Sequence, residues 1–278
     1  MKINIYDKNF MTYDKSSTFG KAPKSFEYVK NQKNFDGITI FTDRCFDEVH
    51  HANSKYNIAW QVESPVHSNK QFNPMLKYAD KFDMIITYDE NLIQKNPDKF
   101  KRANFGGTTV SNPMMYPKTK DICIVHSGKN DTPNHALRSQ VIKKYGDKID
   151  VFGRCTGKPF GNIQDVYKDY RFAIVIENIN HDNYFSEKLT DAMACGTFPI
   201  YNGSFKSVDS IFNPRGVCKW DSLNALGASL WGSQFNSEFY DRYIDGIEDN
   251  LKKAATEFYT NEDWLYTNYL RNFINNNK

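Results

Sequence analysis

The chain of 278 residues is long enough for two domains of ordinary size, at about 100–200 residues each. Hydrophobic residues make up 40% of it and charged residues 25%, a balance that excludes disordered and fibrous proteins. The 36 basic and 33 acidic residues leave a net charge of only +3 and form no basic stripe, so composition gives nucleic acid no support as a partner.

The sequence also indicates a compartment. It begins MKINIYDKNF, which lacks the apolar core of a signal peptide, and no apolar run reaches the roughly 18 residues of a transmembrane helix. The five cysteines are scattered without a CxxC pair, which is typical of a reducing compartment and not of a disulfide framework. We therefore expect a soluble, cytoplasmic protein with no transmembrane segment.

In the first half of the chain, short apolar runs alternate with polar or mixed segments. The runs predict strands at Ile3–Tyr6, Gly37–Phe41, Asn57–Trp60 and Met84–Tyr88. The stretch Thr109–Asp121 contains two prolines and no hydrophobic periodicity. It is predicted to be the linker between two lobes.

The second half continues this alternation more clearly. Its apolar runs predict strands at Asp121–Val125, Ile149–Phe152, Arg171–Glu177 and Phe198–Tyr201. The run Arg171–Glu177 is almost continuously apolar, as in a strand that is buried on both faces. Strands that alternate with helices in this way predict an α/β fold with mainly parallel strands.

Capping residues and apolar spacing place the helices of the second half. Thr132 and the proline after it predict a helix over Pro133–Tyr145. A serine cap and a glycine stop predict another over Ser186–Cys195. Apolar residues recur at helical spacing over Phe239–Ile247 and again over Leu265–Ile274. The last stripe predicts a terminal amphipathic helix that packs on the body of the protein.

Several familiar motifs are absent. The sequence has no GxGxxG, no Walker A, no GxSxG and no HExxH, which argues against dinucleotide, P-loop, α/β-hydrolase and zincin chemistry. It also lacks a DxD triplet that would suggest a metal-held nucleotide diphosphate. The adjacent His50 and His51 match no familiar set of metal ligands. We expect no metal site.

The densest cluster of polar residues follows the buried strand Arg171–Glu177. It consists of Glu177, Asn178, Tyr184, Ser186, Glu187 and Lys188. Ligands of open α/β sheets bind beyond the carboxyl ends of the strands, where a helix N-terminus suits phosphate. Lys188 opposes the helix dipole there, which calls for a nearby anion such as a diphosphate. The alternative is that Glu187 caps the helix while Lys188 extends into solvent.

A second phosphate ligand is predicted in the helix Pro133–Tyr145. Arg138 lies one to two turns inside this helix, which follows the loop that contains Ser127, Gly128 and Lys129. An arginine at that place can bind phosphate with two parallel hydrogen bonds. The alternative is an ordinary surface arginine.

These motifs together resemble a known family. The pattern EN-x5-Y-x-S-E-K over 177–188 resembles the donor-binding motif of the family 10 α-1,3-fucosyltransferases. The likeness continues through GTFPIY (Gly196–Tyr201) and FNP (Phe212–Pro214), and NHALR, which ends at Arg138, resembles the family's arginine-bearing helix. VES around Glu63 and FDMIITYDEN (82–91) resemble its acceptor lobe more loosely.

The resemblance implies the GT-B architecture, which consists of two Rossmann-like lobes. Residues 1–117 would form the acceptor lobe and residues 118–258 the nucleotide-sugar lobe. Residues 259–278 would form a helix that crosses back to the first lobe. The same resemblance implies an inverting glycosyltransferase that needs no cofactor and moves fucose from GDP-fucose to a saccharide hydroxyl.

Donor-binding roles follow from the resemblance residue by residue. The donor-binding set would be Arg138, Asn178, Tyr184, Glu187, Lys188, Glu177 and Ser186. Arg138 and Lys188 would neutralise the leaving diphosphate and so stand in for a metal ion, because cations stabilise charge that grows in the transition state. Glu187 and Asn178 would bond ribose or sugar hydroxyls, and Tyr184 would contact the diphosphate or the sugar.

The general base implied by the resemblance is Glu63, which would take the proton of the acceptor hydroxyl. The family normally has Gly before this glutamate and Asn after it, whereas this chain has Val62 and Ser64. Asp89 and Glu90 therefore stay open as alternative bases. A further departure is Asn202, where the family often has Trp.

Two other functions remain open. One keeps the GT-B fold but uses another nucleotide sugar to modify DNA bases or a protein, as a phage or viral enzyme would. The other is a non-catalytic sugar-binding module. The combination of Arg138, Glu187 and Lys188 argues against the module, because a lectin has no need for ligands of a diphosphate.

Overall fold

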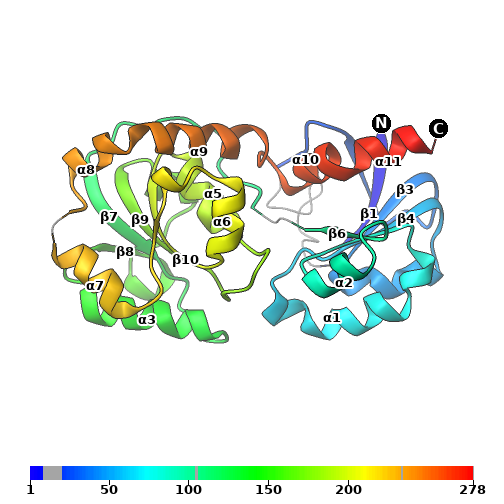
Figure 1. Ribbon diagram of the computed structural model, residues 1–278, viewed down its shortest axis with the longest axis horizontal. Coiled ribbons are helices and arrows are strands. Elements are labelled where there is room, and N and C mark those ends of the chain that lie inside the picture. The colour runs from blue at the N-terminus through cyan, green and yellow to red at the C-terminus, as the bar shows by residue number, and fades with distance from the viewer. Residues whose placement is uncertain (9–20, 104–105, 233, 278) are drawn as a thin grey trace. The chain divides into compact units, whose positions relative to one another are not determined.

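The computed structural model describes residues 1–8, 21–103, 106–232 and 234–277 (Figure 1). The chain divides into two compact units, of which the first comprises residues 1–105 with 259–278 and the second residues 106–258. Each unit contains a parallel sheet with helices on both sides. The predicted α/β class with two Rossmann-like lobes is thus confirmed.

The first unit contains a six-stranded parallel sheet in the order β2-β1-β3-β4-β5-β6. Its strands are β1 (Lys2–Tyr6), β2 (Glu27–Lys30), β3 (Asn34–Thr42), β4 (Asn53–Trp60), β5 (Met84–Thr87) and β6 (Phe100–Arg102). The four predicted strands β1, β3, β4 and β5 are confirmed. The sequence did not predict β2 and β6, because these short edge strands are only partly buried and have no long apolar run.

Helices cover both sides of this sheet. On one side lie α1 (Pro65–Lys77) and α2 (Glu90–Lys95), and on the other lie α10 (Asn261–Leu265) and α11 (Arg271–Asn276) (Figure 1). A π-helical turn, Tyr266–Leu270, joins α10 to α11, and 3-10 turns span Asp43–His50 and Ala79–Lys81. Buried aromatic rings on this sheet and the segments around it, such as Phe41, Phe46 and Phe82, form the core.

The C-terminal helices are anchored to the first unit by specific contacts. The Asp263 carboxylate accepts hydrogen bonds from the backbone N–H groups of Lys24 (2.9 Å) and Ser25 (2.8 Å). The hydroxyl of Tyr269 donates to the Arg102 carbonyl oxygen at 2.7 Å. The end of the chain therefore returns to the unit that holds its beginning.

The second unit contains a five-stranded parallel sheet in the order β11-β10-β9-β7-β8. Its strands are β7 (Lys120–Val125), β8 (Asp150–Phe152), β9 (Tyr170–Ile176), β10 (Phe198–Asn202) and β11 (Cys218–Lys219). The four predicted strands are confirmed within one residue at each end. Every residue of β9 but Arg171 is buried, as its apolar sequence predicts.

The helices of the second unit lie on both faces of this sheet, with α3 and α7 on one side and α9 on the other (Figure 1). They are α3 (Pro133–Tyr145), α4 (Ile163–Tyr167), α5 (Glu187–Ala194), α6 (Phe205–Ile211), α7 (Leu223–Trp231), α8 (Ser237–Arg242) and α9 (Ile244–Thr256), with 3-10 turns at Arg154–Thr156 and Pro214–Gly216. The predictions of α3 and α5 are confirmed. The helical spacing over 239–247 belongs to two helices, since the backbone leaves helical geometry at Tyr243 (φ −109°, ψ 14°).

The segment before β7 is attached to the second unit. The Asp191 carboxylate on α5 accepts hydrogen bonds from the Thr108 hydroxyl (2.7 Å) and the Thr109 backbone N–H (2.6 Å). The Met114 N–H donates to the Ala194 carbonyl oxygen at 3.0 Å. The division between the units at 105–106 therefore precedes the predicted boundary at 117–118.

In the part of the chain that the structure describes, no helix combines the length and apolar character needed to cross a bilayer.

Candidate functional site

The loop from β9 to α5 is held by a buried carboxylate. Glu177, the first residue after β9, is fully buried and accepts hydrogen bonds from the Ser186 backbone N–H (2.9 Å) and hydroxyl (2.6 Å). Burial raises the pKa of Glu177, while the charge of Lys188 opposes that rise. The structure thus uses Glu177 and Ser186 to fix the start of α5.

Lys188 lies in the first turn of α5, where the helix dipole disfavours a cation. Its Nζ donates to the Glu187 carboxylate at 2.9 Å and to Ser186 Oγ at 3.1 Å. Burial lowers the pKa of Lys188, but Glu187 and Glu177 more than offset this, so the net pKa rises. Lys188 is 28% exposed and its charge is matched within the protein, so it does not simply extend into solvent.

Arg138 comes from α3 and is 5% exposed, which distinguishes it from a surface arginine. Its Nε donates to the Ile176 carbonyl oxygen at 3.1 Å, and its Nη2 donates to Asn178 Oδ1 at 3.0 Å. Burial lowers the pKa of this guanidinium, and Glu177 and Glu187 oppose the effect. The structure therefore brings Arg138 and Asn178 together at the carboxyl end of β9.

The charges at this end of the second sheet are balanced. Arg138 and Lys188 contribute two positive charges, and Glu177 and Glu187 contribute two negative ones. Burial raises the pKa of Glu187, but the neighbouring ammonium of Lys188 outweighs it and the net pKa is lowered. Lys188 is therefore paired with a carboxylate of its own helix at this edge of the sheet.

Two further residues of this region, Tyr184 and Asn202, are buried. Tyr184 is 4% exposed, and the ring of the adjacent Phe185 packs against Phe258 with 5.4 Å between ring centroids. Asn202, where the family often has Trp, is buried. Its Nδ2 donates to the Trp220 carbonyl oxygen at 2.9 Å, so this side chain connects β10 to the segment after β11.

Two histidines near Arg138 were missed at the level of sequence. His126 follows β7 directly, and its Nε2 lies 3.2 Å from Ser139 Oγ. His135 is 3% exposed, and its Nδ1 lies 2.6 Å from the Asp131 carboxylate. Burial, followed by the charge of Arg138, lowers the pKa of both imidazoles. A histidine directly after a predicted strand is the signal that would have found His126.

The candidate base Glu63 lies in the first unit, in the loop between β4 and α1. The backbone N–H groups of Val62 and Glu63 both donate to Asp43 Oδ2 at 3.0 Å. Asp43 is 1% exposed, and burial raises its pKa to about 7. The Glu63 carboxylate makes no hydrogen bond or ion pair to any residue that the structure describes.

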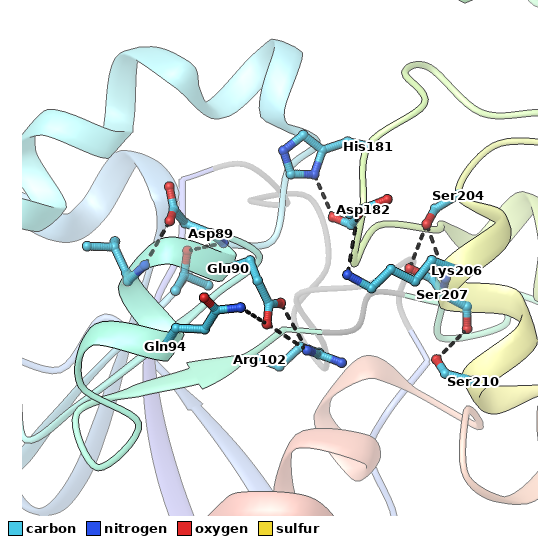
Figure 2. A network of polar contacts seen from close by, with 12 residues as sticks. Asp89, Glu90, Gln94, Arg102, His181, Asp182, Ser204, Lys206, Ser207 and Ser210 are labelled. Atoms are coloured by element: carbon cyan, nitrogen blue, oxygen red, sulfur yellow. Dashed lines mark hydrogen bonds and ion pairs between the residues drawn. The ribbon is translucent and has the colours of Figure 1, made fainter.

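The alternative bases are engaged in local structure (Figure 2). Asp89 caps α2, where its Oδ1 accepts from the Leu92 backbone N–H at 2.9 Å. Glu90 forms an ion pair with Arg102 at 2.9 Å and accepts from Gln94 Nε2 at 3.3 Å. Among these three carboxylates, Glu63 is the one with neither oxygen hydrogen-bonded to a residue that the structure describes.

Metal ligands were sought over the same residues. Within residues 1–8, 21–103, 106–232 and 234–277, no three or more His, Cys, Asp or Glu side chains are grouped so that they could hold a metal ion.

Comparison with known proteins identifies the family. Residues 115–265, more than half of the chain, match the model of "Glycosyltransferase family 10 (fucosyltransferase) C-term". Alpha-(1,3)-fucosyltransferase 7 of Homo sapiens is 31% identical over 117 residues, which are 39% of this chain and 34% of that protein. The matches span between 29% and 52% of the length of the curated relatives.

Solved structures share the fold. An α1,3-fucosyltransferase crystallised with GDP has a TM-score of 0.55 at 17% identity, over 94% of this chain and 89% of that one. An α-glucosyltransferase in complex with UDP-glucose and DNA has a TM-score of 0.55 at 11% identity, over 91% and 95%. The family match, the fold and the sequence pattern agree: the chain belongs to glycosyltransferase family 10.

Proposed function

We propose that the protein is an inverting glycosyltransferase that moves fucose from GDP-fucose to a hydroxyl of a saccharide. The observation that carries this proposal is the convergence of Arg138, Asn178, Glu187 and Lys188 at the carboxyl end of β9, where the capped helix α5 begins. The name of the human relative and the GDP bound to a structural neighbour support the choice of donor.

The leaving group of this reaction is a nucleoside diphosphate, whose negative charge grows as the sugar departs. Arg138 and Lys188 would stabilise that charge together with the N–H groups of the first turn of α5. Lys188 would exchange its ion pair with Glu187 for the diphosphate oxygens. Glu187 and Asn178 would then bond ribose or sugar hydroxyls, and Tyr184 would support the diphosphate or the sugar. These cations supply the positive charge for which other enzymes use a metal ion.

The acceptor hydroxyl needs a base. In the proposed reaction Glu63 takes its proton while the hydroxyl oxygen attacks the anomeric carbon of fucose and the bond to the diphosphate oxygen breaks. Attack from the face opposite the leaving group inverts the configuration at that carbon. Glu63 is preferred to Asp89 and Glu90, because those two carboxylates hold α2 and Arg102.

The donor site is tested by thermal stabilisation with GDP, UDP, ADP, CMP and dTDP. A ligand at about 100 times its Kd adds about 2.7 kcal/mol of stability. We expect a GDP-selective increase in Tm that Arg138→Ala and Lys188→Ala abolish. Lys206→Ala is the matched control, because its ion pair with Asp182 (3.4 Å) lies on an exposed surface of the same unit (Figure 2).

The other outcomes decide between functions. A UDP-selective shift would contradict fucose as the donor sugar and favour the alternative enzyme that modifies DNA or protein. No shift with any nucleotide would contradict the donor site itself and favour the non-catalytic sugar-binding module.

A further inference from the structure

The carboxyl edge of the first sheet contains a buried acidic side chain that the proposed reaction does not yet use. Asp43 directly follows β3 and is 1% exposed. Burying a carboxylate is costly unless hydrogen bonds compensate it. Its Oδ2 accepts from two successive backbone N–H groups, those of Val62 and Glu63, each at 3.0 Å.

This arrangement fixes the peptide unit that precedes the Glu63 side chain. The pKa of Asp43 is about 7, and in the ionised form of this carboxylate the two hydrogen bonds are roughly twice as strong as neutral ones. With both N–H groups bound to one oxygen, the Val62–Glu63 peptide cannot rotate without breaking a bond. The direction in which the Glu63 side chain leaves the backbone is therefore set by Asp43.

The neighbouring strands complete this support. The Gln61 backbone N–H donates to the Ile86 carbonyl oxygen at 3.0 Å, and the Thr87 hydroxyl donates to Gln61 Oε1. On the other side, the Thr42 hydroxyl donates to Asp7 Oδ1 at 2.9 Å. Hydrogen bonds thus connect the carboxyl ends of β1, β3, β4 and β5. Among the residues that make them, Asp43 is the one that binds the Glu63 backbone.

We propose that Asp43 is a positioning residue for Glu63, which it holds in place through the backbone N–H groups of Val62 and Glu63. This inference rests on the proposed function, in which Glu63 is the general base. A displacement of about 1 Å at a reacting group can lower the rate about 100-fold. Loss of Asp43 is therefore expected to lower kcat while leaving nucleotide binding unchanged.

The test measures kcat and KM of the Asp43→Ala and Asp43→Asn variants. The assay follows the release of GDP from GDP-fucose in the presence of a panel of disaccharide acceptors. Asparagine keeps an oxygen that accepts both N–H groups, so Asp43→Asn should retain kcat within about 10-fold, whereas Asp43→Ala should lose about 100-fold. KM for GDP-fucose should not change. Asp263→Asn is the matched control, since Asp263 is also buried and accepts backbone hydrogen bonds in the first unit.

A double-mutant cycle with Glu63→Gln separates positioning from general damage. If Asp43 acts through Glu63, Asp43→Ala should hardly change the residual rate of the Glu63→Gln protein. A 100-fold loss in that background as well would overturn the positioning role. So would a folded Asp43→Ala protein with wild-type kcat. If Glu63→Gln alone leaves turnover intact, the proposed base fails, and this outcome is distinct from either of the others.

Hydrogen exchange provides a readout that does not depend on activity. The amides of Val62 and Glu63 should exchange about tenfold faster in Asp43→Ala, or in Asp43→Leu, which also lacks an acceptor, if the alanine variant does not fold. The amides of Lys24 and Ser25, which Asp263 holds, should not change. Equal protection of Val62 and Glu63 in wild type and variant would overturn the proposal.

Discussion

The ion pair between Glu187 and Lys188 links the stability of the fold to the proposed donor site. The sequence predicted that Lys188 needs an anion nearby. In the structure this anion is the Glu187 carboxylate, and the Ser186 hydroxyl is a second hydrogen-bond partner of the Lys188 ammonium. The ammonium is therefore held close to the helix N-terminus before any ligand arrives. A diphosphate would meet a preorganised cation whose protein partner can be exchanged.

Replacement of Lys188 by methionine should therefore weaken the fold as well as the donor site. It leaves the carboxylates of Glu187 and Glu177 without their cation, which we expect to cost about 1–3 kcal/mol of unfolding free energy. The double variant Glu187→Gln/Lys188→Met should recover part of this loss. Urea unfolding at pH 7 measures both effects. Stability equal to that of Lys206→Met would contradict the importance of the pair.

Asp191 predicts a pH dependence of stability. Burial raises its pKa to about 7, and Glu187 adds to the rise. The folded state therefore keeps a proton on Asp191 that the unfolded state loses near pH 4, and the stability contribution of this residue falls as pH rises from about 4 to 7.

Asp191→Asn removes this titration. The variant should gain stability relative to wild type as pH rises from 5 to 8, which urea unfolding at several pH values measures. A difference between the two proteins that stays constant over this range would show that Asp191 keeps an ordinary pKa in the fold.

At the scale of elements, local signals predicted the parts of the fold that local chemistry determines. The caps Thr132 and Ser186 and the left-handed Gly196 (φ 64°) are visible in the sequence, so α3 and α5 were placed correctly. The edge strands β2, β6 and β11 depend on pairing with a neighbour and were missed. The break between α8 and α9 at Tyr243 could not be predicted from the sequence, because no glycine or proline stands at that position.

The candidate site was predicted to a similar extent. Most of its proposed donor residues lie in one continuous segment, 177–188, which is why the sequence alone could group them. That Arg138 reaches the carboxyl end of β9 follows from α3 packing on the sheet, which spacing alone does not show. Asp43 was missed because its two hydrogen bonds connect residues that are distant in sequence. The sequence around Asp43 contains no motif that indicates this contact.

The turn after β10 contains a glycine, Gly203, that lies close to Tyr201 and Glu177. A Cβ atom at Gly203 would lie 2.2 Å from the Tyr201 hydroxyl oxygen and 2.8 Å from Glu177 Cγ. Gly203→Ala should therefore displace Glu177 and the cap of α5, at a cost of about 1–3 kcal/mol. It should also reduce the Tm increase given by GDP.

Gly161→Ala is the matched control, because a Cβ there meets no atom within 4 Å. Melting curves with and without GDP compare the two variants. If both behave like wild type, Gly203 does not support the site.

At the scale of the whole molecule, the two units differ in how closely the family constrains them. The family match covers 115–265, which is mainly the second unit, whereas residues 1–105 of the first unit lie outside it. The residues of the proposed donor site all lie within the part of the chain that the family model covers. The proposal of Glu63 as the base depends on a carboxylate that bonds to no described residue and on the proposed positioning by Asp43, and the acceptor is the part that the sequence predicted least.

The measurement that tests the proposed reaction most directly is product analysis with GDP-fucose and the disaccharide panel. Wild-type protein should release GDP and form a fucosylated product whose anomeric configuration, read by NMR, is inverted relative to the donor. Glu63→Gln should lose turnover and keep the GDP-induced Tm increase. Retention of configuration, or turnover of Glu63→Gln within a few-fold of wild type, would contradict the mechanism.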